Sequence, residues 1–590
     1  MIRRGRGRGT GAALLIAVLL ISSGAFDSAL GADQGTADQG ASAPATPGGT
    51  AAPTTGAAGG ASSPTAPANP LAAPGVLPTL ATGVTATTAP PVGVAVRLGN
   101  VGGSVAAANA LGLTAPARAP GLTITPSLGI QGEYTSNALN TSTDERSDFI
   151  GTVTPGLLIN LSTPYATGTL SYAPSLQWYA NNSSQNNVNQ FLNGALNATL
   201  LPRTLLLSIN AYVTEQRTVG GVTPGGVTTF GSQDTVTTSS FSFTPTFTHR
   251  FGDIGTLNVI YSLQYTNQGG NSQTAPGATL PFFVASRSLA NLGSATFTTG
   301  PFLGRFNNTL SANATIDSGT GILNTAHQYM VTDTLRYALL RRVYVFGTLG
   351  YENIFYPSSP VFRLSDGVWA VGLHLTPPGN SDITLGYGSF FGLASPFLRA
   401  TIALSPRTTL ALVYTNVLGT QAQLLQSAVA STTVDAFGNP IDNTTNVPVL
   451  LTNQLLSVQS SLVRQAQFSG TITSTWPRDT FSLSVLDTQQ KLIANAPGTT
   501  GFSQNSWSLG VSWSHRLTPD LTAVTYGQYG AATSQGGSGL FPVYAAQFGL
   551  VDRLTPTLFG SLTYALSNTL GSAGASAVTN SVVLALQKTF

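Results

Sequence analysis

Charged side chains are scarce in this sequence, and the scarcity limits what kind of protein it encodes. Only 8% of the 590 residues are charged, whereas about 25% is usual in globular domains. Lysine occurs twice, at Lys491 and Lys588. Water-facing surfaces are normally covered by charge, while lipid-facing surfaces must avoid it. The composition therefore disfavours a set of soluble domains and favours a chain with a large lipid-facing surface.

Cysteine is absent, and long apolar runs are lacking too. Without cysteine the chain cannot form disulfides, thiolate metal sites, a cysteine nucleophile or a lipid-modified N-terminal cysteine. No stretch beyond residue 21 reaches the roughly 18 uncharged apolar residues that a membrane-spanning helix needs. We therefore expect no transmembrane helix.

The first residues have the pattern of a secretory signal peptide. A basic segment with four arginines precedes the apolar run Ala12–Ile21, and small residues at 29–32 offer a cleavage site. The run of 10 residues is half of the about 20 that a spanning helix needs. We expect residues 1–31 to be removed during export. Of 24 basic and 21 acidic side chains, 20 of each would then remain, which gives no electrostatic reason to expect a nucleic-acid partner.

Residues 32–120 form a second, low-complexity region. The segment has no aromatic residue and is dominated by Ala, Pro, Gly and Thr. Such a composition cannot bury enough apolar area to offset the entropy of ordering the chain. We predict a disordered periplasmic tether over 32 to about 92. Residues 92–113 are more apolar, and two alternatives remain for them: a short ordered piece or more linker.

From residue 121 onward the sequence alternates with a period of two, which is the pattern of β-strands. In the segment 205–214, for example, Leu207, Ile209 and Val213 alternate with polar residues. The apolar face is expected to meet lipid and the polar face to line a lumen. The predicted lumen-facing side chains are Gln131, Glu133, Asn160, Ser208, Asn210, Asn258 and Gln264.

Connections between the predicted strands alternate between short and long. Short, proline-containing turns lie near Arg203, Arg407, Arg478, Pro519 and Pro556. Long polar loops span 220–236, 269–285 and about 418–463. Ten-residue strands with short turns on one side and long loops on the other are typical of outer-membrane barrels. We predict an all-β fold: an antiparallel up-and-down transmembrane barrel over 121–590 with about 22 strands, in a range of 18 to 24. An even number places both barrel ends in the periplasm.

The last strand carries a candidate assembly signal. Val582, Leu584, Leu586 and Phe590 share one face, and Phe590 is the last residue. A terminal Phe after alternating apolar residues resembles the signal that the barrel-assembly machinery reads, although Lys588 departs from the usual apolar residue. The expected partners are outer-membrane lipid, periplasmic chaperones and that machinery.

The first three predicted strands resemble the β-barrel porin group that includes outer-membrane proteins of exopolysaccharide and exosortase systems. The matching residues are Tyr134, Asn137, Asp148, Phe149, Pro155, Gly156, Leu170, Tyr172 and Pro174. The resemblance implies an integral outer-membrane protein of a Gram-negative bacterium with polysaccharide-export components as partners. It implies no catalytic residues.

No constellation of residues indicates catalysis or a cofactor. The four histidines, His249, His327, His374 and His515, are scattered and lack the spacing of metal ligands. The four glutamates, Glu133, Glu145, Glu215 and Glu352, fall near strand ends or in loops, where a solvated rim is favoured over an acidic mouth. Tryptophans near strand ends favour an interfacial girdle over a sugar-binding slide. We expect neither an enzyme nor a metal or cofactor.

Two functions fit these predictions. The first is a porin-like channel, passive or gated, whose Ser, Thr, Asn and Gln lining passes hydrophilic solutes. The second is a structural or docking component of an envelope assembly, with a plugged lumen. An open, conducting lumen would favour the first, and a plugged lumen with co-purifying partners would favour the second.

Overall fold

The computed structural model describes residues 121–217, 235–270, 273–274, 279–379, 381–424, 432–434, 440–442, 455–533, 539–570 and 576–590. The predicted signal peptide, the tether and the segment 92–113 lie outside these residues, as does most of the predicted loop 220–236. No helix within the described ranges is long and apolar enough to cross a membrane.

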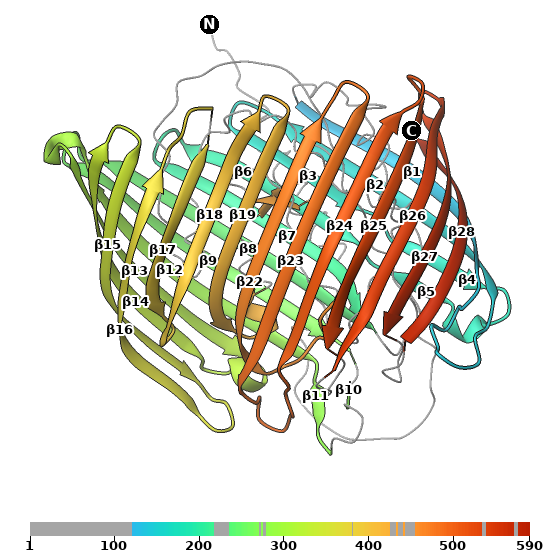
Figure 1. Ribbon diagram of the computed structural model, residues 1–590, viewed down its shortest axis with the longest axis horizontal. Coiled ribbons are helices and arrows are strands. Elements are labelled where there is room, and N and C mark those ends of the chain that lie inside the picture. The colour runs from blue at the N-terminus through green and yellow to red at the C-terminus, as the bar shows by residue number, and fades with distance from the viewer. Residues whose placement is uncertain are drawn as a thin grey trace, which may run out of the picture.

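The described residues form a closed antiparallel barrel of 22 strands (Figure 1). The strand β1 (Gly121–Thr135) pairs with β2 (Asp148–Ser162), and β28 (Ser576–Thr589) closes the barrel by pairing with Ser127–Thr135. The prediction of about 22 strands is therefore confirmed.

Two of the barrel strands are interrupted. The third consists of β3 (Ala166–Tyr172) and β4 (Ser175–Tyr179), which both pair with β2. Pro174 lies in the gap and has no N–H to give to the ladder. The fourth strand consists of β5 (Asn187–Asn189) and β6 (Leu192–Leu201), which pair with β4 and β3.

The other strands follow in chain order. They are β7 (Leu205–Arg217), β8 (Thr235–Arg250), β9 (Gly255–Gly269), β12 (Ser286–Thr299), β13 (Phe306–Gly319), β14 (His327–Leu340), β15 (Val343–Tyr356), β16 (Phe362–Leu375), β17 (Asp382–Phe390), β18 (Leu393–Ser405), β19 (Thr408–Gly419), β22 (Leu462–Thr475), β23 (Asp479–Ala494), β24 (Gln504–Arg516), β25 (Leu521–Thr533), β26 (Leu540–Thr555) and β27 (Leu558–Leu570). Short hairpins within connections are β10 (Gln273–Thr274) with β11 (Pro281–Phe283), and β20 (Thr432–Val434) with β21 (Pro440–Asp442).

Short and long connections lie at opposite ends of the barrel, as the sequence predicted. Turns at 202–204, 406–407 and 476–478 join strands at the upper end in Figure 1, which we call the short-turn end. The long-loop end holds the connections 218–234, 270–285 and 420–461. One connection there departs from the prediction, because β17 and β18 are joined by Phe391 and Gly392 alone. Both have positive φ, 54° and 66°, the conformation that a two-residue hairpin requires.

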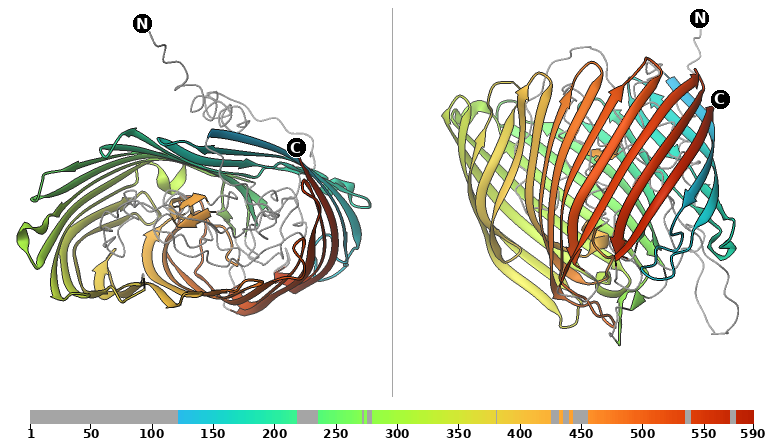
Figure 2. Two further views of the ribbon diagram at one scale, coloured as in Figure 1. Left: turned by 90° about the horizontal axis from the view of Figure 1, so that it is seen from above. Right: turned by 45° about the vertical axis from the view of Figure 1, so that its right-hand side comes forward.

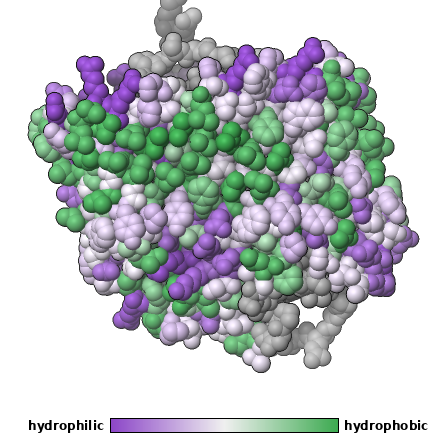
Figure 3. Space-filling model, viewed as in Figure 1, coloured by the Kyte–Doolittle hydropathy of each residue, from purple (hydrophilic) through white to green (hydrophobic). Residues whose placement is uncertain are grey.

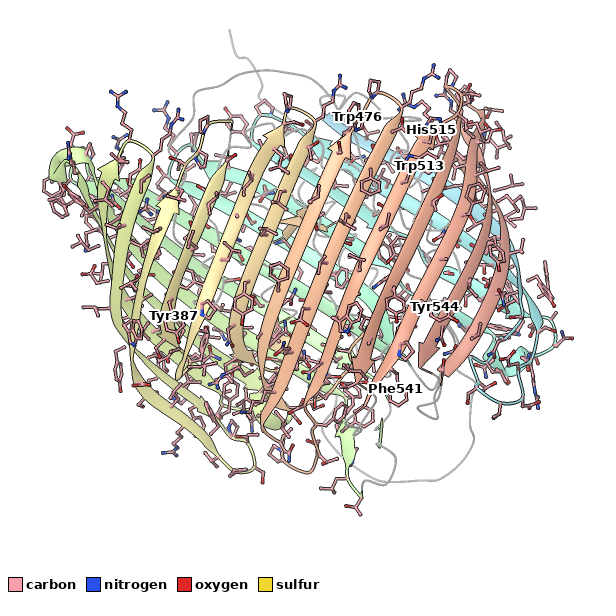
Figure 4. The ribbon with its side chains drawn as sticks, viewed as in Figure 1. Tyr387, Trp476, Trp513, His515, Phe541 and Tyr544 are labelled. Atoms are coloured by element: carbon pink, nitrogen blue, oxygen red, sulfur yellow. The ribbon has the colours of Figure 1, made fainter. Side chains whose placement is uncertain are left out.

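The outer surface carries an apolar band between aromatic girdles (Figures 3 and 4). Trp476, Trp513 and His515 lie near the short-turn end, and Tyr387 lies in the girdle at the opposite end. Outside the band, hydrophilic side chains gather along the upper edge (Figure 3). A closed antiparallel barrel with these features has the architecture of an outer-membrane protein.

All five tryptophans are exposed: Trp178, Trp369, Trp476, Trp507 and Trp513. Trp507 stacks edge-on with Tyr529 at 5.8 Å, and Asp479 accepts hydrogen bonds from the rings of Trp513 and His515 at 3.0 and 2.7 Å. Amphipathic aromatic side chains of this kind favour the membrane–water interface. The tryptophans therefore lie on the outer surface, which favours the predicted girdle over a sugar-binding slide.

One part of the outer face is not open to lipid. Ile209 belongs to the predicted lipid-facing set, yet only 5% of it is exposed. It packs in an apolar cluster on the outer side of β2, β3, β6 and β7, with Leu170 and Leu196. Leu170 fills the space that a side chain at Gly194 would occupy, with its Cδ1 2.6 Å from that position. Contacts within this cluster therefore hide side chains that a period-two pattern alone assigns to lipid.

Candidate functional site

The candidate site is the interior of the barrel, whose cross-section is a flattened oval (Figure 2). The inner and outer faces separate clearly on β1. Gln131 is 3% exposed, while the next residue outward, Ile130, is 55% exposed. Glu133 is fully buried on the same inner face. Alternate residues point to opposite sides of a strand, so both predicted residues lie on the inner wall.

The other predicted lumen residues also lie on the inner face, where several form cross-strand hydrogen bonds. Asn160 accepts one from Thr169 at 3.0 Å, and Ser208 donates one to Asn197 at 2.7 Å. Asn210 is buried on β7. Asn258 accepts a hydrogen bond from Thr248, and Gln264 donates one to Ser262. The structure thus brings the seven predicted residues to one continuous surface spanning β1 to β9.

Polar side chains also dominate inner faces further along the wall in both directions from β1. The inner faces of β8 and β9 consist largely of Ser, Thr, Asn and Gln, and Thr244 hydrogen-bonds Ser262 at 2.7 Å. The inner face of β24 carries Gln504 and a row of serines at 506, 508 and 512. Uncharged hydroxyl and amide groups of this kind can replace the hydration of a hydrophilic solute.

The opposite wall contains an apolar cluster, which corrects the prediction of a uniformly polar lumen. Along β14 to β18 the inward side chains include Met330, Phe346, Val368, Ala370 and Phe397, which form one buried cluster. Phe346 packs over Gly372, and Phe397 packs over Gly386. The sequence shows which of these residues share a strand face, because they alternate. It does not show which face points inside the barrel.

At the long-loop end, side-chain hydrogen bonds join the described parts of the connections to the barrel wall. Gln423 follows β19 and reaches β13, where it donates to Asp317 at 2.8 Å. The hydroxyl of Tyr356 on β15 donates to Gln423 at 2.9 Å, and Gln328 donates to that hydroxyl. Ser288 donates to the second oxygen of Asp317 at 3.1 Å. Gln423 therefore bonds β13 and β15 directly, and it is linked to β12 and β14 through Asp317 and Tyr356.

The far end of the same connection is held by a second group of glutamines. Gln504 on β24 accepts a hydrogen bond from the backbone of Ser457 and donates to its carbonyl, both at 2.9 Å. Gln421 donates to the same carbonyl at 3.0 Å and accepts from the backbone of Gln459 at 2.9 Å. Both ends of the connection 420–461 are therefore anchored inside the wall.

Two neighbouring connections complete this closure. The backbone of Ser460 donates to Phe282 at 3.1 Å, and the backbone of Thr500 donates to Pro281 at 2.9 Å. Phe282 stacks edge-on with Phe502 at 5.7 Å, and both pack with Val458. The hairpin β20–β21 lies inside the oval and contacts β6 (Figure 2). We call this interlocked set of connections, 279–285, 420–424, 455–461 and 495–503, the mouth cap.

Two glutamates that were expected on a solvated rim are buried instead. Glu133 and Glu352 have no exposed surface. Glu352 accepts a hydrogen bond from the backbone of Gly392 at 3.0 Å, and Arg464 donates to the carbonyl of Phe391 at 2.6 Å. The side chains of Glu352 and Arg464 thus hold the two-residue turn between β17 and β18. Their role is structural, which the spacing along the sequence could not show.

The described residues contain no group of three His, Asp or Glu side chains placed to hold a metal ion. His249 and His515 lie one residue before the short-turn ends of β8 and β24. His327 lies at the opposite end, at the start of β14. His374 points inward and contacts Asp382 at 2.8 Å.

No protein-family model and no curated protein sequence matches this chain. Its fold is similar to that of several solved outer-membrane proteins. The FrpB iron transporter from Neisseria meningitidis (F3-3 variant) is 10% identical, with 79% of this chain and 81% of that chain covered and a TM-score of 0.46. The siderophore receptor PirA from Acinetobacter baumannii is 9% identical over 80% and 81%, with a TM-score of 0.44. The ferric-catecholate import receptor Fiu from E. coli K12 is 11% identical over 79% and 81%, also with a TM-score of 0.44.

These likenesses concern the fold alone, and the identity is too low to transfer a ligand. The names of the three proteins are those of iron-uptake proteins. The resemblance to exopolysaccharide-associated proteins therefore stays a prediction from the sequence.

Proposed function

We propose that the chain is a gated outer-membrane channel for hydrophilic solutes, closed by the mouth cap in the conformation described above. The observation that carries the proposal is the set of inward Ser, Thr, Asn and Gln side chains, which dominate the inner faces of β8 and β9 and recur on β24. A lining of hydroxyl and amide groups suits polar solutes. We place the short-turn end in the periplasm, because outer-membrane barrels have their short turns there. The proposal includes no catalytic step.

The gate is proposed because the cap is held by side-chain hydrogen bonds. The net contribution of a hydrogen bond to stability is about 0.5–1.5 kcal/mol, and that of a hydrogen bond to a charged group is about 1.5–3 kcal/mol. The side chain of Gln423, for example, joins the connection after β19 to both Asp317 and Tyr356. The free energy lost with a few such bonds is similar to the few kcal/mol that separate two conformations of a protein.

Planar-bilayer conductance of the refolded full chain tests the proposal. We expect infrequent openings of the wild type and more frequent openings of Gln423→Ala, and a larger conductance after deletion of residues 432–442. Gln489→Ala is the matched control, because Gln489 lies on the outer face of β23 and bonds Asp487. Absence of current in all these proteins would contradict the channel.

The second candidate function is a structural or docking component of an envelope assembly. The closed mouth and the apolar wall of β14 to β18 favour it. The finer proposal, a link to exopolysaccharide export, is supported by the sequence resemblance of the first three strands. Co-purification of export components with a non-conducting barrel would favour this function over the channel.

A further inference from the structure

A buried arginine lies on the inner wall near the short-turn end, and no carboxylate of the described residues accepts a hydrogen bond from it. Arg336 on β14 is 8% exposed and points inward. It donates no hydrogen bond to any residue in the described part of the chain, and its Nε is buried without an acceptor. Its guanidinium lies over the ring of Tyr344, 5.7 Å from the centroid. Burying a charge without a hydrogen-bonded partner costs free energy, so such groups usually bind a ligand or form a structural ion pair.

A histidine adjoins this arginine through the same tyrosine. His374 on β16 is 3% exposed, and its ring stacks on Tyr344 at 5.5 Å. Its Nε2 contacts the carboxylate of Asp382 at 2.8 Å, while its Nδ1 is buried without a partner. The cluster thus presents two unpartnered nitrogens, one on each side of Tyr344.

The surroundings of the cluster are mainly basic and reach water. Arg399 on β18 faces the lumen, since it pairs with the inward Thr384. Arg341 and Arg342 form the turn between β14 and β15. The carboxylate that lies nearest, Asp382, already contacts His374, and its side chain is 52% exposed. Solvent therefore reaches the edge of the cluster from the short-turn end.

We propose that Arg336, packed against Tyr344, binds the anionic group of a hydrophilic solute, a carboxylate or a phosphate, on the lumen wall. Arg336 supplies the charge and the forked N–H donors that suit oxyanions. His374 stacks on Tyr344 from the neighbouring strand and is a positioning residue, because it holds the ring against which the guanidinium packs. This inference deepens the proposed channel by naming its solute class, but binding itself requires no current.

Isothermal titration calorimetry of the folded full chain in detergent tests the proposal with inorganic phosphate, acetate and, as a neutral probe, glycerol. We expect the wild type to bind at least one anion more tightly than glycerol. Arg336→Gln should weaken that binding at least tenfold. Arg250→Gln is the matched control, since Arg250 lies exposed at the β8–β9 turn and bonds the carbonyl of Gly252; its binding should equal that of the wild type.

Each binding result supports or overturns the anion site, whether or not the barrel conducts current. Binding of both anions supports a general site for anionic groups, and binding of phosphate alone supports a site for phosphate esters. No anion binding by the wild type, or equal binding by Arg336→Gln, overturns it. His374→Gln provides a second variant if Arg336→Gln does not reach the folded form on a heat-modifiable gel; it should weaken binding several-fold. A barrel that binds anions without conducting would refute the channel and leave this site in place.

Discussion

Neighbouring residues on one strand of this barrel experience very different surroundings. Ile209 packs in the outer apolar cluster with Leu170 and Leu196, while Asn210 points to the inner polar face. Both are nearly buried, so exposure does not distinguish them. The chemistry of the neighbours does, because one side is hydrocarbon and the other offers hydroxyl and amide groups.

This contrast predicts unequal effects of the same substitution. Ile209→Arg should lower the yield of folded barrel strongly, since an arginine on the lipid side costs about 2–4 kcal/mol at the midplane and here must also enter a packed cluster. Asn210→Arg should retain more folded protein and shift the selectivity of any current towards anions. Heat-modifiable migration and the reversal potential in asymmetric salt measure the two effects. Equal losses of folded protein would mean that the two sides of β7 do not differ as described.

At the scale of the element, the last strand determines closure. Nine residue pairs, from Ser127↔Thr589 to Thr135↔Ser581, join β1 to β28. Val582, Leu584, Leu586 and Phe590 are exposed on the outer face, as the predicted assembly signal requires. The backbone of Phe590 also donates to the carbonyl of Pro126 at 3.0 Å. This terminal bond adds a structural contact that the sequence did not suggest.

Removal of Phe590 should therefore leave the protein in the periplasm, because the terminal apolar stripe is lost as a signal. Cell fractionation measures the membrane-inserted fraction. Deletion of residues 220–236 is the control, since it removes a connection at the opposite end and should leave insertion intact. If both deletions reach the outer membrane in equal amounts, Phe590 has no role in assembly.

At the scale of the whole molecule, every described strand belongs to the barrel or to a short hairpin within one of its long connections. The ring is closed by β1 and β28, which pair over Ser127–Thr135 and Ser581–Thr589, so each barrel strand has a hydrogen-bonded neighbour on both sides. A complete ladder leaves no unpaired sheet edge in hydrocarbon.

We accordingly predict that deletion of residues 32–92 behind the signal peptide leaves the barrel able to fold. The segment lacks the aromatic and charged residues that would anchor it. Outer-membrane yield and the heat-modifiable band should match those of the full chain within about twofold, as expected for a segment that buries little apolar area. Disappearance of the folded band would show that the segment takes part in folding.

Much of this architecture was determined by the sequence alone. The period of two, the proline-containing turns near Arg203, Arg407 and Arg478, and the loop lengths predicted 22 strands and their direction, because these are local properties of the chain. The same pattern assigned Gln131, Asn160 and Gln264 to a common face. The sequence missed the two-residue turn at Phe391 and Gly392, whose positive φ values follow from the hairpin rather than from any glycine–asparagine signal.

Other features were decided only by the tertiary structure. Gln423 and Asp317 are 106 residues apart and meet because the connection after β19 folds into the mouth. Arg336 and His374 share Tyr344 because three strands align in register. Phe346 and Met330 face inward although their pattern matches that of lipid-facing residues. Alternation states which residues share a face, but only closure of the barrel, through long-range pairing, decides which face encloses the lumen and what lies across it.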